Sequence, residues 1–145
     1  MAALLGLDLG EKRVGVAVSD EMGSLAVPLK TLSFISRKEL LREIQSLVRE
    51  YAVESIVVGF PITLKGETGP AAKKVQEHVR WFEEKLPMPW ILWDERLTTQ
   101  EVERILLDAD LSRDRRKEVR DRLAAQRILQ NYLDFKRMKG ENRPL

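Results

Sequence analysis

The spacing of apolar positions along the chain predicts strands in the first third and alternating helices and strands after it. The sequence predicts strands over residues 3–9, 14–19, about 25–32, 55–60 and 90–93, and those over 3–9, 55–60 and 90–93 are apolar on both faces. Residues that are apolar on both faces are typical of strands covered on both sides. The first three strands follow each other with short turns and form a predicted antiparallel meander, whereas the last two are separated by helical segments.

Helical spacing marks the segments between and after the later strands. Ser36 with Glu39 three residues later has the form of a capping box, and the apolar period of a helix continues to Tyr51. Pro70 suits the first position of a second helix. One face of that helix is predicted to carry Ala71, Val75, Val79, Phe82 and Leu86.

Two more helices are expected, one capped by Thr98 with Glu101 and a last one over about 113–136. The fold class is therefore α/β, with a mixed five-stranded sheet, a three-strand meander followed by parallel strands, and helices on both faces. Residues 1–138 are expected to form a single domain, followed by a flexible tail over 139–145.

The amino-acid composition excludes several kinds of catalytic and metal-binding site. The 145 residues include no cysteine and a single histidine, His78, which falls on a polar part of its helix and is expected to be exposed. Disulfides, thiolate nucleophiles, Cys-based zinc sites and a Ser-His-Asp triad are excluded or disfavoured. No apolar run approaches the roughly 20 residues that span a bilayer. The N-terminus lacks the pattern of a signal peptide, so a cytoplasmic protein without a membrane partner is expected.

Charge is distributed unevenly along the chain. Residues 1–111 carry 14 Lys and Arg against 18 Asp and Glu, whereas residues 112–145 carry 11 against 5. The net charges of these parts are −4 and +6. A basic end beside an acidic body suits a polyanion such as nucleic acid, although a solvated helix face gives the same pattern.

Carboxylates interrupt apolar runs at three places. Asp8 lies at the end of the first strand, and Asp94 and Glu95 follow the last strand. If these strands are parallel, their carboxyl ends meet at one edge of the sheet. Asp121 lies on the last helix, on the face of an apolar stripe made of Ala124, Ala125, Ile128 and Tyr132.

A buried carboxylate must be protonated, paired with a cation or bound to a metal. A salt bridge to one of the 25 Lys and Arg residues explains any single case. Several carboxylates converging on one edge favour Mg²⁺ or Mn²⁺, because these ions prefer oxygen ligands. The candidate phosphate-binding residues nearby in sequence are Lys12, Arg13, Arg96, Thr98, Arg116 and Arg120, and Arg127 shares a helix face with the last two. Thr98 is a helix cap first, and a solvated face remains the alternative for the helix arginines.

Four motifs resemble one family in order and spacing. They are GLDLGEKRVGVAVSD, VVGFPITLKGETGPAAKKV, LWDERLTT and KEVRDRLAAQRILQNYL. The chain resembles, from about Leu4 to Leu133, the RNase H-like family described as Holliday junction resolvases and as pre-16S ribosomal RNA nucleases. The first motif alone is weak, because actin-like kinases open similarly.

The resemblance implies a metal-dependent nuclease with an RNase H-like fold whose acidic triad falls on Asp8, Glu95 and Asp121. It makes Asp94 the weaker member of its pair and implies Mg²⁺ or Mn²⁺ as cofactor. The expected activity is 5′-end maturation of pre-16S rRNA, with four-way DNA junction resolution as the alternative. A non-catalytic ribosome-assembly factor and an ATP-dependent phosphotransferase are the other classes, and 145 residues supply only one of the two domains that the latter needs. Monomer and dimer both remain open.

Overall fold

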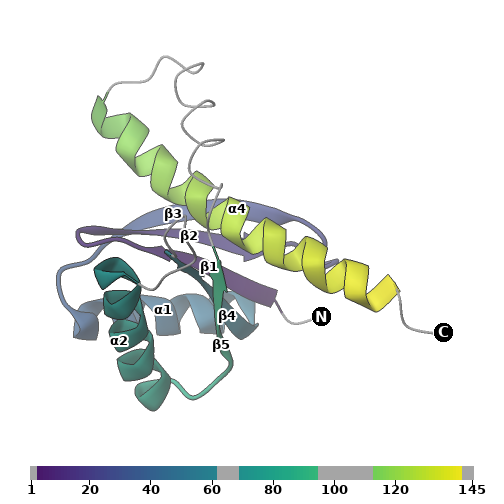
Figure 1. Cartoon of the computed structure of the whole chain (residues 1–145), viewed down its shortest axis with the longest axis horizontal. Coiled ribbons are helices and arrows are strands. Elements are labelled where there is room, and N and C mark those ends of the chain that lie inside the picture. The colour runs from purple at the N-terminus through teal and green to yellow at the C-terminus, as the bar shows by residue number, and fades with distance from the viewer. Residues whose placement is uncertain (1–2, 62–68, 95–112, 142–145) are drawn as a thin grey trace.

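The computed structural model describes residues 3–61, 69–94 and 113–141 (Figure 1). The strands are β1 (Ala3–Leu9), β2 (Arg13–Ser19), β3 (Ala26–Ser33), β4 (Val53–Phe60) and β5 (Trp90–Asp94). The helices are α1 (Arg37–Tyr51), α2 (Pro70–Lys85) and α4 (Arg113–Glu141). The strands and helices expected within these residues are all present, and the helix predicted after Thr98 lies outside the described residues. Helix α4 extends to Glu141, which lies within the segment expected to be a tail.

The five strands form one mixed sheet in the order β3-β2-β1-β4-β5. Strands β1, β2 and β3 pair antiparallel, while β4 is parallel to both β1 and β5. Leu7 of β1 is paired with Val58 of β4, and Phe60 of β4 is paired with Asp94 of β5. The carboxyl ends of β1, β4 and β5 therefore meet at one edge of the sheet, as the sequence predicts.

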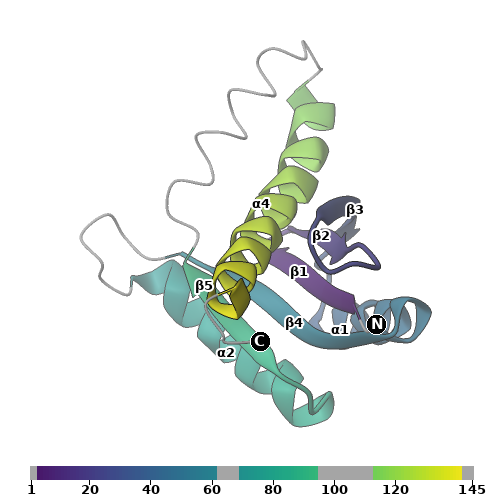
Figure 2. The same cartoon turned by 90° about the vertical axis from the view of Figure 1, so that its right-hand side faces the viewer.

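Helices cover both faces of the sheet. Figures 1 and 2 show α1 and α2 on one face and α4 lying across the other. The core under α1 and α2 includes Leu5, Leu7 and Phe82, and the core under α4 includes Ile128 and Leu129. Two covered faces explain why β1 and β4 are apolar at both odd and even positions.

Local signals in the sequence account for the helix ends. The Ser36 hydroxyl accepts a hydrogen bond from the Glu39 backbone N–H at the start of α1. Helix α2 begins at Pro70 as predicted, but its buried face contains Ala72 and leaves Ala71 exposed. The predicted stripe was therefore wrong by one residue at that end. No described helix is long and apolar enough to cross a membrane.

Helix α4 approaches the sheet closely because two strand positions lack a side chain. A Cβ atom on Gly6 would lie 2.8 Å from the Leu129 Cβ, and one on Gly15 would lie 1.7 Å from the Asp121 backbone oxygen. The second distance is far below any van der Waals contact, and it involves backbone that cannot rotate away. Glycine at position 15 therefore sets how near α4 lies to the centre of the sheet.

Candidate active site

Two of the predicted carboxylates, Asp8 and Asp121, come together under α4. Asp8 pairs with Gly15 on the neighbouring strand, and the backbone of Asp121 rests on that same glycine. Leu4 and Gly6 contact α4, and side chains alternate along a strand, so Asp8 faces α4 as well. Residues that are 113 positions apart in sequence (121 − 8) thus share one small region of the sheet.

The proximity of Asp121 changes the acidity of Asp8. Burial, and then the negative charge of Asp121, raise the pKa of Asp8 from 3.8 to about 6. Among the described residues, no hydrogen bond or ion pair to the Asp8 side chain relieves this. Within that part of the chain, the site therefore holds a carboxylate without a partner cation.

Asp121 is paired with an arginine. Arg13 Nε donates a hydrogen bond of 2.7 Å to Asp121 Oδ2, and the two side chains are 37% and 17% exposed. A salt bridge was the alternative explanation for each buried carboxylate. Within the described residues, Asp121 has one and Asp8 does not. Arg13, a predicted substrate-binding residue, therefore contacts one carboxylate of the pair directly.

The third predicted carboxylate, Glu95, lies outside the described residues, as do Arg96 and Thr98. Glu95 follows β5, whose carboxyl end is at the same edge of the sheet as that of β1. Asp94 shares a face of β5 with Trp90 and Leu92, which pack against the core under α1 and α2. Asp94 therefore lies on the face of the sheet opposite to Asp8.

Hydrogen bonds from polar side chains hold α4 along the edge strand β3. Thr31 Oγ1 donates to the Glu118 carbonyl (2.7 Å), and Gln126 Nε2 donates to the Ala26 carbonyl (3.2 Å). Gln130 Oε1 accepts from the Ala26 N–H (2.8 Å), and its Nε2 donates to the Ser24 carbonyl (2.9 Å). These contacts fix the position of α4 along the sheet and hence that of Asp121. None of them was predicted from the sequence.

The other predicted phosphate-binding residues that the structure describes lie in the turn between β1 and β2 and on α4. Lys12 is exposed in the turn between β1 and β2, where its carbonyl accepts from the Phe34 N–H. Arg116, Arg120 and Arg127 are half-buried, so they do not form a fully solvated helix face. None of these positions tests a role in substrate binding.

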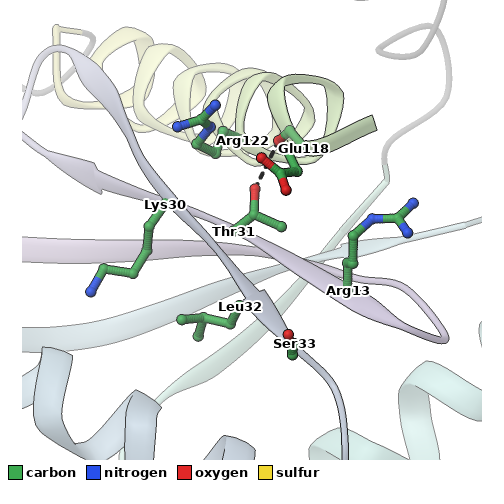
Figure 3. A pocket seen from close by; sticks show the side chains of 7 residues that line it. All are labelled: Arg13, Lys30, Thr31, Leu32, Ser33, Glu118 and Arg122. Carbon is green, nitrogen blue, oxygen red and sulfur yellow. Dashed lines mark hydrogen bonds between the residues drawn. The ribbon is translucent and has the colours of Figure 1, made fainter. Parts of the chain in front are cut away.

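A pocket of about 300 Å³ opens between β3 and α4 next to Arg13 (Figure 3). It is lined by Arg13, Lys30, Thr31, Leu32, Ser33, Glu118 and Arg122. Three cationic side chains and one carboxylate give this lining a positive balance. In Figure 3, Thr31 points from β3 toward Glu118 and Arg122 of α4, whereas the Lys30 side chain points away from α4.

The donors at this site fit a hard divalent cation. Asp8 and Asp121 provide only oxygen atoms, and Mg²⁺ is held in proteins by one or two carboxylates together with water and substrate phosphates. Burial first, and then the charge of Asp121, raise the pKa of Asp8, and a divalent cation between the two carboxylates would offset both effects. Within the described residues, no group of three or more potential ligands is found, so the described part of the site supplies two carboxylates.

A protein-family model described as "RuvX: Holliday junction resolvase" matches residues 2–135. The chain belongs to the RuvX family. A relative named "Putative pre-16S rRNA nuclease" from Thermoanaerobacter pseudethanolicus is 47% identical over 137 residues, which cover 94% of this chain and 99% of the relative. A protein of the same name from Syntrophomonas wolfei is 49% identical over 131 residues, covering 90% and 93%.

Solved structures with the same fold include two junction resolvases. Thermus thermophilus RuvC bound to a Holliday junction substrate superposes with a TM-score of 0.59 at 15% identity, and each chain is covered completely. Fowlpox virus resolvase with Holliday junction DNA gives 0.56 at 11%, with 92% and 98% covered. The RuvX chain therefore has the RuvC-like RNase H fold that the sequence predicts.

Proposed function

We propose that this RuvX protein is a metal-dependent nuclease that hydrolyses phosphodiester bonds in precursor 16S rRNA. The observation that carries the proposal is the pair of carboxylates, Asp8 and Asp121, held together by β1, Gly15 and α4. A pure binding module gains nothing from repelling phosphates at this place. The family also argues against the ATP-dependent phosphotransferase, since it is described as a nuclease family.

Asp8, Asp121 and Glu95 would hold Mg²⁺ or Mn²⁺. When bound, such an ion lowers the pKa of a water molecule and stabilises charge on the phosphate oxygens. Below its raised pKa, Asp8 would have to lose its proton in order to hold such an ion. Asp121 stays oriented by α4, whose position along β3 is fixed by Thr31 and Gln126.

RNA is the first candidate substrate because the 47% and 49% identical relatives carry the name of a pre-16S rRNA nuclease. A four-way DNA junction is the second, because the family model is described as a Holliday junction resolvase. A resolvase cuts two symmetric strands and requires a symmetric pair of sites. Maturation of one RNA end does not.

The experiment that tests the function is Mn²⁺-dependent cleavage of two labelled substrates, a precursor 16S rRNA segment and a four-way DNA junction. We expect cleavage of the RNA, loss of cleavage with EDTA, and no detectable cleavage by Asp8→Asn purified in the same way. Cleavage of the junction alone would establish the second substrate. Binding without cleavage of either would favour the assembly-factor alternative, and wild-type cleavage by Asp8→Asn would remove Asp8 from the site.

Arg120 gives a separate test of the basic helix. Arg120→Ala is expected to weaken RNA binding and to lower the slope of log K against log salt by about 0.7–0.9, the change for one lost phosphate contact. Fluorescence anisotropy over a range of salt concentrations measures this slope. Arg49→Ala is the matched control, because Arg49 is exposed on α1, on the opposite face of the sheet. An unchanged slope in Arg120→Ala would show that this arginine does not contact phosphate.

A further inference from the structure

We propose that Arg13 is a built-in counter-ion that couples metal binding to substrate binding. In the metal-free protein Arg13 forms an ion pair with Asp121, and in the complex with metal and nucleic acid it binds a phosphate of the nucleic-acid strand instead. The proposal rests on the proposed function, because it takes Asp8 and Asp121 as the metal-binding carboxylates. It assigns Arg13 a role that a simple phosphate contact does not include.

The first support is the contact itself. The hydrogen bond of 2.7 Å between Arg13 Nε and Asp121 Oδ2 joins full charges and lies partly out of water. A guanidinium at this distance neutralises the same carboxylate that a divalent cation would use. Because two cations on one carboxylate repel each other, metal binding must weaken the Arg13 pair, and the Arg13 pair must weaken metal binding.

The second support is that the Arg13 side chain borders an open pocket into which it can move. Its side chain is 37% exposed, against 17% for Asp121, and it forms one end of the pocket between β3 and α4 (Figure 3). Arg122 of α4 also lines this pocket, so a backbone phosphate placed there meets cations from β2 and from the helix. Arginine holds phosphate oxygens bidentately, which compensates for the bond to Asp121.

Arg13 thus links two binding events. A phosphate that draws Arg13 away frees Asp121 for the metal, and a metal on Asp121 frees Arg13 for the phosphate. By thermodynamic linkage, each ligand raises the affinity for the other by the same factor. The metal is then bound tightly only when substrate is present.

The first part of the test measures Mn²⁺ affinity without nucleic acid, by calorimetry. Arg13→Gln is expected to bind Mn²⁺ about tenfold more tightly than wild type, equivalent to about 1.4 kcal/mol. Arg13→Lys keeps the charge but not the guanidinium geometry, and its Mn²⁺ affinity is expected to lie between those of wild type and Arg13→Gln. It replaces Arg13→Gln in the test if that variant folds poorly. Arg49→Gln removes one positive charge from the exposed surface of α1, on the opposite face of the sheet, and is expected to leave the Mn²⁺ affinity near the wild-type value.

The second part repeats the titration with a short fluorescein-labelled RNA hairpin, whose integrity is checked on a gel afterwards. RNA is expected to raise the Mn²⁺ affinity of wild type by a larger factor than that of Arg13→Gln, because only in wild type does it also release Asp121 from Arg13. Equal or weaker Mn²⁺ binding by Arg13→Gln without RNA would overturn the counter-ion role while leaving the proposed function intact. Mn²⁺ binding that is undetectable in every variant, or undiminished in Asp8→Asn, would overturn the metal site itself and this proposal with it.

Discussion

Asp8→Asn is expected to raise the free energy of unfolding of the metal-free protein by about 3 kcal/mol at pH 8. This value is the rise of the Asp8 pKa from 3.8 to about 6, converted at 1.36 kcal/mol per pKa unit. The reason is that wild type must keep Asp8 ionised at this pH, partly buried and beside Asp121. Asparagine has almost the same shape without the charge. The expected gain is the cost of keeping the Asp8 carboxylate ionised beside Asp121 in the metal-free protein.

The direction of this effect with pH follows from the folded and unfolded pKa values. Because the folded state binds the Asp8 proton more tightly, the stability that the proton contributes is complete below pH 3.8 and is lost as pH rises through about 6. The advantage of Asp8→Asn is therefore absent near pH 3.5, grows between pH 4 and 6, and is constant above pH 7. Adding Mg²⁺ stabilises wild type and not the variant, which narrows the difference.

Urea unfolding in EDTA across this pH range measures the difference in free energy. Asp20→Asn is the matched control, because backbone hydrogen bonds, from Leu25 first, lower the pKa of Asp20. The stability from Asp20 is present above pH 3.8 and is lost as pH falls, so Asp20→Asn is expected to be less stable than wild type at pH 8. If Asp8→Asn were equally or less stable than wild type at pH 8, the ionised Asp8 carboxylate would not destabilise the metal-free protein.

The convergence of Asp8 and Asp121 could be predicted because each depends on a local pattern. The strand of Asp8 is recognisable by its apolar run, and the face of Asp121 follows from helical spacing to Ala125 and Ile128, which are fully buried. That prediction required β1 and β5 to run in the same direction, and the sheet meets this condition, because β4 pairs parallel with both. Glu95 stays a prediction, since it lies outside the described residues.

The ion pair of Arg13 with Asp121 could not be predicted, because 108 residues separate the two and any of 25 cations was an equal candidate. Only the register of β2 on β1 and the position of α4 select Arg13. His78 was likewise expected to be exposed, but it is half-buried, accepts a hydrogen bond from Arg37 Nε (2.9 Å) and packs against Phe34 and Phe82. Helical spacing places His78 on its own helix correctly but contains no information about neighbours from other elements.

Gly15 is a position whose importance the sequence predictions missed, although its sequence context carries a signal. A lone glycine inside a strand indicates a close approach of another backbone, and here that backbone belongs to Asp121. The neighbours across the sheet are Asp8 on β1 and Thr31 on β3, which hydrogen-bonds the α4 backbone at Glu118. Asp8, Gly15 and Thr31 therefore form one row across β1, β2 and β3. In this row Asp8 is the carboxylate, Gly15 contacts the α4 backbone, and Thr31 hydrogen-bonds it.

Gly15→Ala is expected to cost about 3 kcal/mol of stability or more, above the usual overpacking range, because the new methyl group meets backbone and not a flexible side chain. Helix α4 must move outward to accept it, and Asp121 moves away from Asp8. We therefore expect weaker Mn²⁺ binding and a loss of RNA cleavage even at temperatures where the variant is folded. Calorimetry and the cleavage assay, run well below the melting temperature, separate this from unfolding.

Gly23→Ala is the control for a glycine replaced in the same part of the fold. Gly23 has a φ of +69°, and the space that a Cβ atom would occupy there is open, so alanine costs about 1 kcal/mol of backbone strain and touches nothing. We expect it to retain Mn²⁺ affinity and cleavage. If Gly15→Ala matched Gly23→Ala in stability and activity, α4 would not rest on Gly15, and the distance between Asp8 and Asp121 would have to be set by other contacts. A Gly15→Ala protein that folds well but binds Mn²⁺ weakly would instead show that this single missing side chain positions the carboxylate pair.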